Sequence, residues 1–391
     1  MEFRKRILHG EALSILRSLP SGVVQTTVTS PPFYRLRRFD ASTWIGGDGR
    51  CDHAGAVETC VRCGAWYGEL GWEPTVDLYI QHLVQIFREV RRVLRHDGVC
   101  WIEIDDSHSG SGRGPTGKNG IGDQARRQGF GTTGVTAPEL PAKNMMLVPE
   151  RLALALQQDG WILRRRIIWV KASSPECVRD RPTRAHSNIL MLSKSSRYLY
   201  DFMAAMDPAR GKAPRRSGGG KFDIVDRAIT KWNPSFYDAV KAAVSMRYCC
   251  DVWVFPPGRY KGPHTATFPP ELPERCIKLS TSEKGACAEC GAPRARQAER
   301  RGAVLRDWVT LGWKATCECR ADETAACIVL DPFAGSGTTL QVARWLGRDY
   351  LGIEANAGFI DLIHQRLRKA DQRIVELEVF RRLAERARTA T

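Results

Sequence analysis

The chain of 391 residues carries 59 Lys and Arg against 43 Asp and Glu, giving a formal net charge of +16, and 43% of its residues are hydrophobic. This composition excludes wholesale disorder, allows one large α/β domain with insertions, and suits a polyanionic partner because each phosphate contact releases counterions. No apolar run approaches the ~20 residues that span a bilayer and no secretory signal opens the chain, so we expect a cytoplasmic protein with no membrane partner.

Hydrophobic periodicity predicts alternating helices and strands along most of the chain. Helices are expected within residues 7–19, over 79–94 and 148–158, directly after 339, and from 357 onward. Strands are expected over residues 23–29, 99–104, 161–171, 189–194, 327–330 and 350–353. This alternation predicts a largely parallel sheet with helices on both faces.

Irregular segments interrupt this pattern. Residues 40–71 and 285–322 are interpreted as insertions, because each holds a group of cysteines. The glycine-rich segment 109–135 is either a linker or a lid that orders on nucleic acid. Residues 203–262 differ in character, because they mix Lys and Arg with Trp, Tyr and Phe and show little periodicity.

A strand, a glycine-rich turn and a helix are predicted around the string DPFAGSGTT at residues 331–339. This arrangement forms nucleotide-binding crevices, because Gly335 and Gly337 let the backbone approach a ligand and the helix N-terminus supplies free amides. The following strand ends in Glu354, where a carboxylate is placed to accept both ribose hydroxyls of an adenosine. A triphosphate-binding loop would need a lysine after the last glycine, but Thr338 stands there.

The string SPPFY at residues 30–34 ends the predicted strand 23–29, because a pair of prolines cannot continue a strand ladder. An exocyclic amino group of a base is a weak nucleophile until hydrogen-bond acceptors turn its lone pair toward a methyl donor. Ser30 Oγ and the Pro31 carbonyl are the candidate acceptors, Pro32 stiffens the turn, and Phe33 offers a face for an extruded base. The alternative is a simple proline stop after a strand.

Together the two motifs resemble those of the amino-methylating DNA methyltransferases, in the permuted group whose catalytic motif precedes its cofactor motif. Here Ser30 precedes Asp331 by 301 residues. The resemblance implies a circularly permuted, Rossmann-like, S-adenosylmethionine-dependent α/β fold that flips a base out of double-stranded DNA. It divides the chain into a catalytic half (1–202), a target-recognition region (203–262) and a cofactor-binding half (263–391).

The resemblance also implies which residues contact the cofactor. Glu11 matches an acid that contacts the cofactor adenine, and Thr267 and Phe268 lie in a segment that lines its methionine end. The other implied cofactor contacts are Thr29, Asp331, Pro332, Phe333, Gly335, Gly337, Thr338 and Glu354.

A Ser-Pro-Pro start is typical of cytosine-N4 enzymes and Asp-Pro-Pro of adenine-N6 enzymes, so the sequence favours cytosine N4, with adenine N6 as the alternative. An RNA methyltransferase and a non-catalytic zinc-containing DNA-binding protein are the other open interpretations. Members of this family are often dimers and can accompany a restriction enzyme, so both a homodimer and a cognate restriction enzyme are candidate partners. Gln25 departs from the family pattern, in which an acid is common before the catalytic strand.

Two groups of cysteines have the spacing of structural zinc sites. The first has the pattern C-x-H-x6-C-x2-C and the second C-x2-C-x26-C-x-C, so each offers four soft ligands and leaves no position open for catalysis. We therefore expect two structural zinc ions. The predicted ligands are Cys51, His53, Cys60 and Cys63 in the first group, and Cys287, Cys290, Cys317 and Cys319 in the second.

Overall fold

The computed structural model describes residues 3–39, 41–53, 58–109, 140–171, 180–208, 246–258, 267–301, 307–319 and 323–389. Most of segment 109–135 and residues 209–245 of the predicted recognition region lie outside the described residues.

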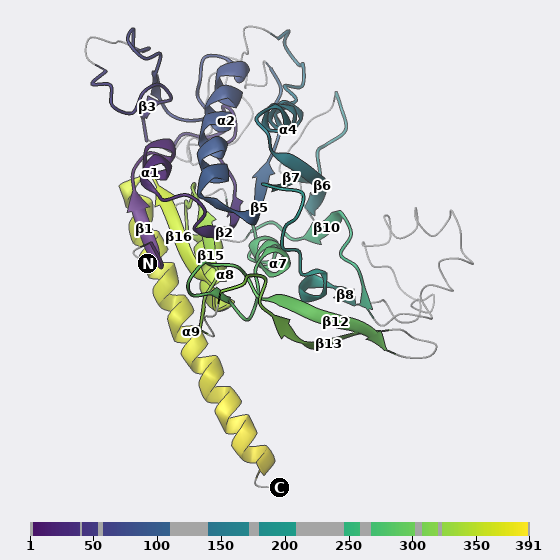
Figure 1. Cartoon of the computed structure of the whole chain (residues 1–391). Coiled ribbons are helices and arrows are strands. Elements are labelled where there is room, and N and C mark those ends of the chain that lie inside the picture. The colour runs from purple at the N-terminus through teal and green to yellow at the C-terminus, as the bar shows by residue number, and fades with distance from the viewer. Residues whose placement is uncertain are drawn as a thin grey trace.

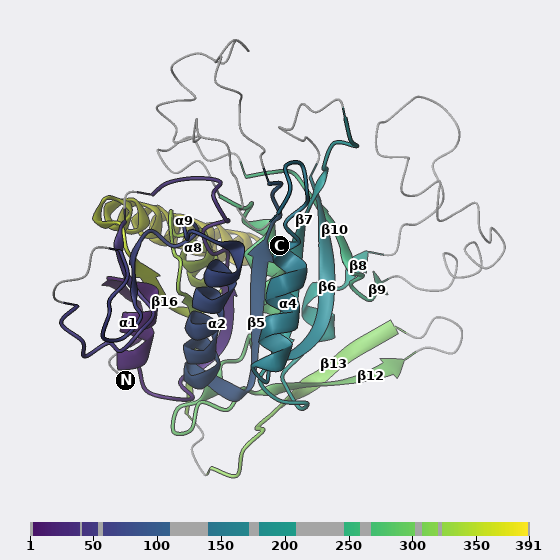
Figure 2. The same ribbon diagram turned by 90° about the horizontal axis from the view of Figure 1, so that it is seen from above.

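An eight-stranded sheet forms the centre of the described molecule (Figures 1 and 2). Strand β7 runs antiparallel to its neighbours β5 and β6, whereas the other neighbouring strands of this sheet are parallel. The order across the sheet is β1 (Arg6–His9), β16 (Asp349–Glu354), β15 (Ile328–Asp331), β2 (Val24–Thr29), β5 (Leu94–Ile104), β7 (His186–Ser193), β6 (Ile162–Lys171) and β10 (Val252–Phe255).

Helices cover both faces of the sheet, as the alternation predicts (Figures 1 and 2). One face carries α1 (Ala12–Ser18), α2 (Val76–Val93) and α4 (Val148–Gln158). The opposite face carries α7 (Glu271–Ser280), α8 (Thr338–Trp345) and α9 (Ala357–Thr389). Within the part of the chain that the structure describes, no helix combines the length and apolarity needed to cross a membrane.

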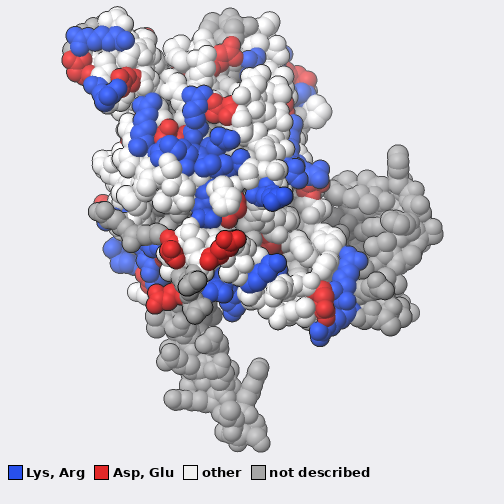
Figure 3. All heavy atoms as spheres, in the orientation of Figure 1, with Lys and Arg blue, Asp and Glu red and all other residues white. Residues whose placement is uncertain are grey.

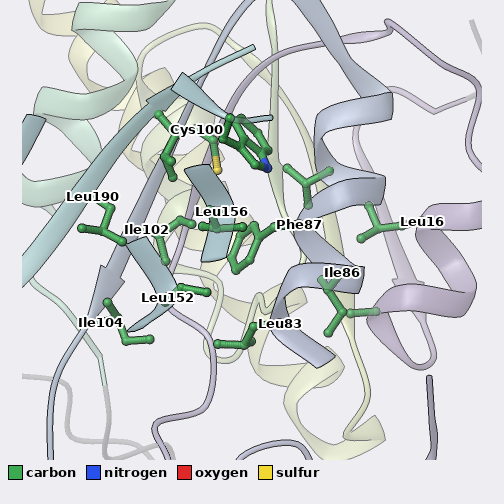
Figure 4. Packing of buried hydrophobic residues seen from close by; sticks show 14 of the residues in the cluster. Leu16, Leu83, Ile86, Phe87, Cys100, Ile102, Ile104, Leu152, Leu156 and Leu190 are labelled. Carbon is green, nitrogen blue, oxygen red and sulfur yellow. The ribbon is translucent and has the colours of Figure 1, made fainter. Parts of the chain in front are cut away.

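Strand alternation divides the core into two layers. On β5, Cys100, Ile102 and Ile104 pack under α1, α2 and α4, where Phe87 of α2 is fully buried (Figure 4). Val99 and Trp101 of the same strand point to the other face and pack with α7 and α8. This period of two explains why residues 99–104 form one buried run in the sequence, because both faces of the strand are covered.

Four small antiparallel ribbons lie outside the main sheet. The first cysteine group lies between β3 (Thr43–Ile45) and β4 (Trp66–Gly68), and the second lies beside β11 (Ala286–Cys287) and β14 (Thr324–Ala325). The other two are the hairpin of β12 (Ala295–Arg301) with β13 (Asp307–Lys314), and the pair β8 (Asp207–Pro208) with β9 (Met246–Arg247). Sequence periodicity did not predict these ribbons, nor β1 and β10; most of these strands have two to four residues, whereas β12 and β13, with seven and eight, lie inside a segment interpreted as an irregular insertion.

Candidate active site

A cavity of about 770 Å³ lies at the carboxyl ends of the central strands. The connections diverge there: β15 leads through α8 to β16 on one side, and β2 leads through α2 to β5 on the other. Open α/β sheets bind ligands at such a switch point, because the diverging loops leave a crevice. The SPPFY turn follows β2 and the DPFAGSGTT turn follows β15, so the two motifs meet at one cavity although they are far apart in sequence.

The structure places 13 of the 15 predicted catalytic and cofactor residues on the wall of this cavity. The two exceptions are Thr29 and Gly337, which do not line the cavity but contact residues that support its wall. Thr29 is buried, and its Oγ1 donates a hydrogen bond of 2.6 Å to Asp331. Gly337 precedes α8 with φ of +79°, and a Cβ there would lie 2.9 Å from Ile363 Cγ2, so this position requires glycine. The 13 are Glu11, Ser30, Pro31, Pro32, Phe33, Thr267, Phe268, Asp331, Pro332, Phe333, Gly335, Thr338 and Glu354.

Asp331 is a buried carboxylate at the end of β15. Its Oδ1 accepts hydrogen bonds from Thr29 Oγ1 at 2.6 Å and from the Phe333 amide at 3.1 Å. Burial raises the pKa of Asp331 to about 6, although these hydrogen bonds oppose the shift. The group is therefore ionised at neutral pH and becomes protonated in mildly acidic solution.

Backbone amides fix the two other acids predicted to contact the cofactor. Glu354 Oε2 accepts from the Gly335 amide at 2.7 Å and Oε1 from the Asn356 amide at 2.8 Å. Glu11 caps α1 by accepting from the Leu13 and Ser14 amides at 2.8 and 2.7 Å. A carboxylate has about four acceptor positions, so each acid can be held rigidly and still accept a hydrogen bond from a ligand. Burial also raises the pKa of Glu354.

The Ser-Pro-Pro turn is held from two sides. Ser30 Oγ donates a hydrogen bond of 2.6 Å to Oε2 of Glu103, a buried residue of β5. The Tyr79 hydroxyl of α2 donates a hydrogen bond of 2.6 Å to the Pro32 carbonyl. Because the Ser30 proton points to Glu103, the lone pairs of Oγ are directed elsewhere and can accept a hydrogen bond. Burial raises the pKa of the Glu103 carboxyl, and the charge of Lys171 opposes that shift.

Sequence reasoning missed Glu103. It occurs in the strand at 99–104, where Val99, Trp101 and Glu103 alternate on one face. An acid on an otherwise apolar buried face, near the carboxyl end of a strand, is a signal of a functional group.

A second polar group missed from sequence lines the far side of the cavity. Asp105 is buried and accepts from Arg184 Nη1 at 2.9 Å, from Ser187 Oγ at 2.9 Å and from Lys171 Nζ at 3.4 Å. Lys171 Nζ also lies 4.9 Å from the centre of the Trp169 ring. These residues give this part of the cavity cationic and aromatic groups beside the Ser-Pro-Pro turn. His108, which follows the end of β5, lines the same cavity.

Both cysteine groups assemble into clusters whose ligand atoms lie within 4.8 Å of one another. In the first cluster, Cys51 Sγ lies 3.7 Å from Cys60 Sγ, and Cys63 Sγ lies 3.4 Å from His53 Nδ1. Zn–S bonds of about 2.3 Å and Zn–N bonds of about 2.1 Å at tetrahedral angles place ligand atoms about 3.5–3.8 Å apart. The four residues of the first cluster therefore fit a structural zinc ion, and the donor set of the second fits equally.

Gln25 contacts the second cluster from the start of β2. Its Nε2 donates a hydrogen bond of 2.9 Å to the Gly291 carbonyl, and its Oε1 accepts a hydrogen bond of 2.6 Å from the Ile328 amide. Only an amide both donates and accepts at these positions, so the departure from an acid is explained by the cysteine cluster packed against this strand.

A family model described as DNA methylase matches residues 24–291 and 317–365. The Type II methyltransferase M.XycI from Xanthomonas campestris pv. cyanopsidis is 32% identical over 375 residues, which cover 95% of this chain and 90% of that protein. The Type II methyltransferase M.Cfr9I from Citrobacter freundii is 30% identical over 375 residues, with the same coverage of 95% and 90%. The DNA adenine methyltransferase YhdJ from Escherichia coli (strain K12) is 22% identical over 367 residues, 93% of this chain and 82% of that protein.

Proposed function

The chain belongs to the family of amino-methylating DNA methyltransferases, and from that premise we propose that it transfers a methyl group from S-adenosylmethionine to N4 of cytosine in double-stranded DNA. The observation that carries the proposal is the Ser30 hydroxyl, which donates 2.6 Å to buried Glu103 at the wall of the cavity that both motifs share. Relatives named Type II methyltransferases support a site-specific enzyme that accompanies a restriction enzyme.

The chemistry follows from what the turn after β2 can accept. The cytosine amine enters the cavity after the base leaves the duplex, and Phe33 stacks against it. Ser30 Oγ and the Pro31 carbonyl accept hydrogen bonds from the two N–H groups of the amine. These bonds turn the nitrogen lone pair out of conjugation with the ring. The N–CH₃ bond forms as the S–CH₃ bond breaks, and the methylated amine then releases a proton to water.

The cofactor side of the cavity fits an adenosine with a charged amino-acid end. Glu354 and Glu11 supply acceptors for ribose hydroxyls and an adenine amino group, and Asp331, Phe333 and Gly335 line the space between them and Ser30. When bound there, S-adenosylmethionine supplies the electrophilic methyl group. The catalytic strand before the cofactor strand is the permuted motif order of the family, and the two cysteine clusters hold structural zinc. Thr267 and Phe268 line the cavity.

Adenine N6 is the second candidate, because the relative YhdJ is named a DNA adenine methyltransferase. The two bases present the same amino group, so the fold and the acceptors of Ser30 and Pro31 serve either one. The serine at position 30, in place of the aspartate typical of adenine enzymes, favours cytosine.

Mass spectrometry of nucleosides separates these products. Genomic DNA of varied composition and, in a parallel reaction, total RNA are each incubated with the protein and methyl-labelled S-adenosylmethionine, then digested. We expect label in N4-methylcytosine. Label in N6-methyladenine would correct the base but keep the mechanism, whereas label only in RNA would overturn the choice of substrate. Sequencing the same DNA for modified positions identifies the recognition sequence.

A further inference from the structure

The two cysteine clusters lie at different places relative to the cavity. The first cluster is carried by the β3–β4 ribbon; Thr43 and Ile45 of β3 line the cavity, as do Glu69 and Leu70, which directly follow β4. The second cluster contacts the amino ends of β2 and β5, through Gln25 and Arg95, while the cavity opens at the carboxyl ends. No described residue between 285 and 325 lines the cavity.

Packing joins the first cluster to the ribbon. The Trp44 ring of β3 stacks on the His53 ring with centroids 4.6 Å apart. The Tyr67 ring of β4 is tilted against Trp44, with the two ring centroids 5.2 Å apart. Gly47 passes so close that a Cβ would lie 2.7 Å from Cys63 Sγ. The position of His53 and Cys63 therefore sets the position of the ribbon.

The ribbon in turn joins the cofactor side of the cavity. The Phe39 amide donates to a carboxylate oxygen of Glu69, and the Phe39 carbonyl accepts from Asn356 Nδ2 at 2.7 Å. Asn356 comes two residues after Glu354, and its amide is one of the donors that fix that carboxylate. The first cluster is thus connected to Glu354 through a short series of contacts.

The second cluster holds the β12–β13 hairpin. Cys287 and Cys290 precede β12, and Cys317 and Cys319 follow β13, so a metal ion bound by all four joins the two strands at their base. The Gly291 turn of this cluster is fixed to the sheet by Gln25 and by Arg95, which donates to the Cys290 carbonyl. The hairpin is therefore attached to the sheet through the cluster.

The hairpin contacts both ends of the segment proposed to recognise DNA. On the entry side, Arg296 donates to both carboxylate oxygens of buried Asp201 at 3.0 and 3.1 Å, and the Phe202 ring lies 4.9 Å from that of Trp308. On the exit side, Tyr248 Oη accepts from Arg300 at 3.0 Å and from Trp308 at 3.1 Å.

The entry and exit also pair with each other. Asp207 and Pro208 of β8 pair with Met246 and Arg247 of β9, and this short ribbon lies near the hairpin (Figure 1). Lys and Arg side chains, with an acidic side chain among them, lie at the end of the hairpin (Figure 3), where Arg300 and Arg301 are exposed. Exposed arginines at this place fit the phosphates of a DNA partner.

We propose that the two metal sites support different functions: the first cluster holds a wall of the cofactor cavity, and the second holds the hairpin that anchors the DNA-recognition segment. This inference rests on the proposed function, since it takes residues 203–262 as the recognition region. Structural zinc stabilises such small ribbons directly, because they bury little apolar surface of their own.

Two matched double variants test this division. Cys51→Ser with Cys63→Ser removes two ligands from the first cluster, and Cys287→Ser with Cys317→Ser removes two from the second. Cys327→Ser is the control: Cys327 lies outside both clusters and outside residues 203–262, and its Sγ contacts the Ser282 carbonyl, to which a serine hydroxyl can also donate. For each protein, zinc content is measured by elemental analysis, S-adenosylmethionine affinity by calorimetry, and DNA affinity by fluorescence anisotropy with a duplex that carries the sequence methylated by the wild type.

We expect each double variant to lose one zinc ion. If the cavity wall formed by the β3–β4 ribbon is ordered in about one molecule in ten, the first variant binds S-adenosylmethionine about tenfold more weakly. Its DNA affinity should stay within about threefold of wild type. The second variant shows the reverse. Equal losses of both affinities in both variants, or no loss in either, would overturn the inference. A wild type that binds neither S-adenosylmethionine nor DNA would instead overturn the proposed function.

Two further variants keep every metal ligand and cover the case in which a double variant does not fold. Trp44→Ala removes the ring stacked on His53, and Phe202→Ala removes the ring packed on Trp308 and Tyr248. Trp44→Ala should weaken only S-adenosylmethionine binding, and Phe202→Ala only DNA binding. An unchanged DNA affinity in Phe202→Ala would show that the hairpin does not anchor the recognition segment.

Discussion

Glu103 sets the direction of the Ser30 hydroxyl, and its substitution tests the catalytic geometry most directly. In the wild type, Ser30 Oγ donates 2.6 Å to a buried carboxylate. In Glu103→Gln the amide oxygen still accepts, but the hydrogen bond becomes neutral. A hydrogen bond to a charged group contributes about 1.5–3 kcal/mol and a neutral one about 0.5–1.5 kcal/mol, so the orientation of Oγ loses roughly 1–1.5 kcal/mol.

If the amine is held by Oγ only while that proton points to Glu103, this loss lowers the methylation rate about tenfold. Glu103→Ala leaves the hydroxyl free to rotate and should lower the rate further. The assay is single-turnover transfer of labelled methyl groups to DNA, with S-adenosylmethionine affinity measured in parallel as the control. The affinity should stay at the wild-type value, because Glu103 lies on the Ser30 side of the cavity.

The pH profile separates orientation from a merely structural role. Burial raises the pKa of Glu103 above its ordinary 4.5, so the carboxylate becomes protonated as the pH falls through that raised value. With S-adenosylmethionine at a saturating concentration, so that protonation of Asp331 near pH 6 does not limit binding, the wild-type rate should decline toward acid, whereas the Glu103→Gln rate should lack this decline. A Glu103→Gln enzyme with the full wild-type rate, or one with the same acid limb, would refute the role assigned to Glu103.

Four other predictions follow from the same contacts. Ser30→Ala should reduce turnover strongly with little change in S-adenosylmethionine affinity, which calorimetry checks. Asp331→Asn should weaken S-adenosylmethionine binding at pH 8 yet raise the melting temperature. The pKa of Asp331 is raised to about 6 in the folded protein, so folding stability is lost as the pH rises from about 4 to 6. An amide does not ionise and therefore avoids this loss. Gln25→Glu should lower the free energy of unfolding by about 1–3 kcal/mol in urea titrations, because the buried Gly291 carbonyl loses its donor. Elemental analysis should find about two zinc ions per chain, and finding none would reject the cysteine interpretation.

The parts of the fold that periodicity predicts are those with long buried faces. Strand β5 was predicted because it carries a continuous apolar run that is buried on both faces. Helix α2 was predicted because its apolar residues recur at helical spacing and pack in one layer of the core. Strand β10 was missed although Trp253 is buried, because it has four residues and lies at the edge of the sheet beside a polar segment. Short edge strands are fixed by pairing with a neighbour, and their own sequence carries little periodic signal.

The candidate site divides in the same way. Asp331, Gly335 and Ser30 were predicted because each stands in a short contiguous motif, DPFAGSGTT or SPPFY, that can be recognised in the sequence without knowledge of distant residues. Glu103 and Asp105 were not, because their function arises from partners distant in the sequence: Ser30 for the first, and Lys171 and Arg184 for the second. A sequence read locally shows a buried acid but not the group that faces it.

Gln25 joins the two levels. In the sequence it is a departure from the family pattern, remote from the catalytic turn. In the structure its amide binds the Gly291 carbonyl on one side and the Ile328 amide at the start of β15 on the other. An acid at this position could accept from Ile328 but could not donate to Gly291, so a chain with a cysteine cluster against this strand favours an amide. The departure and the second cluster therefore depend on each other, and exchanging either alone leaves a buried polar group without its partner.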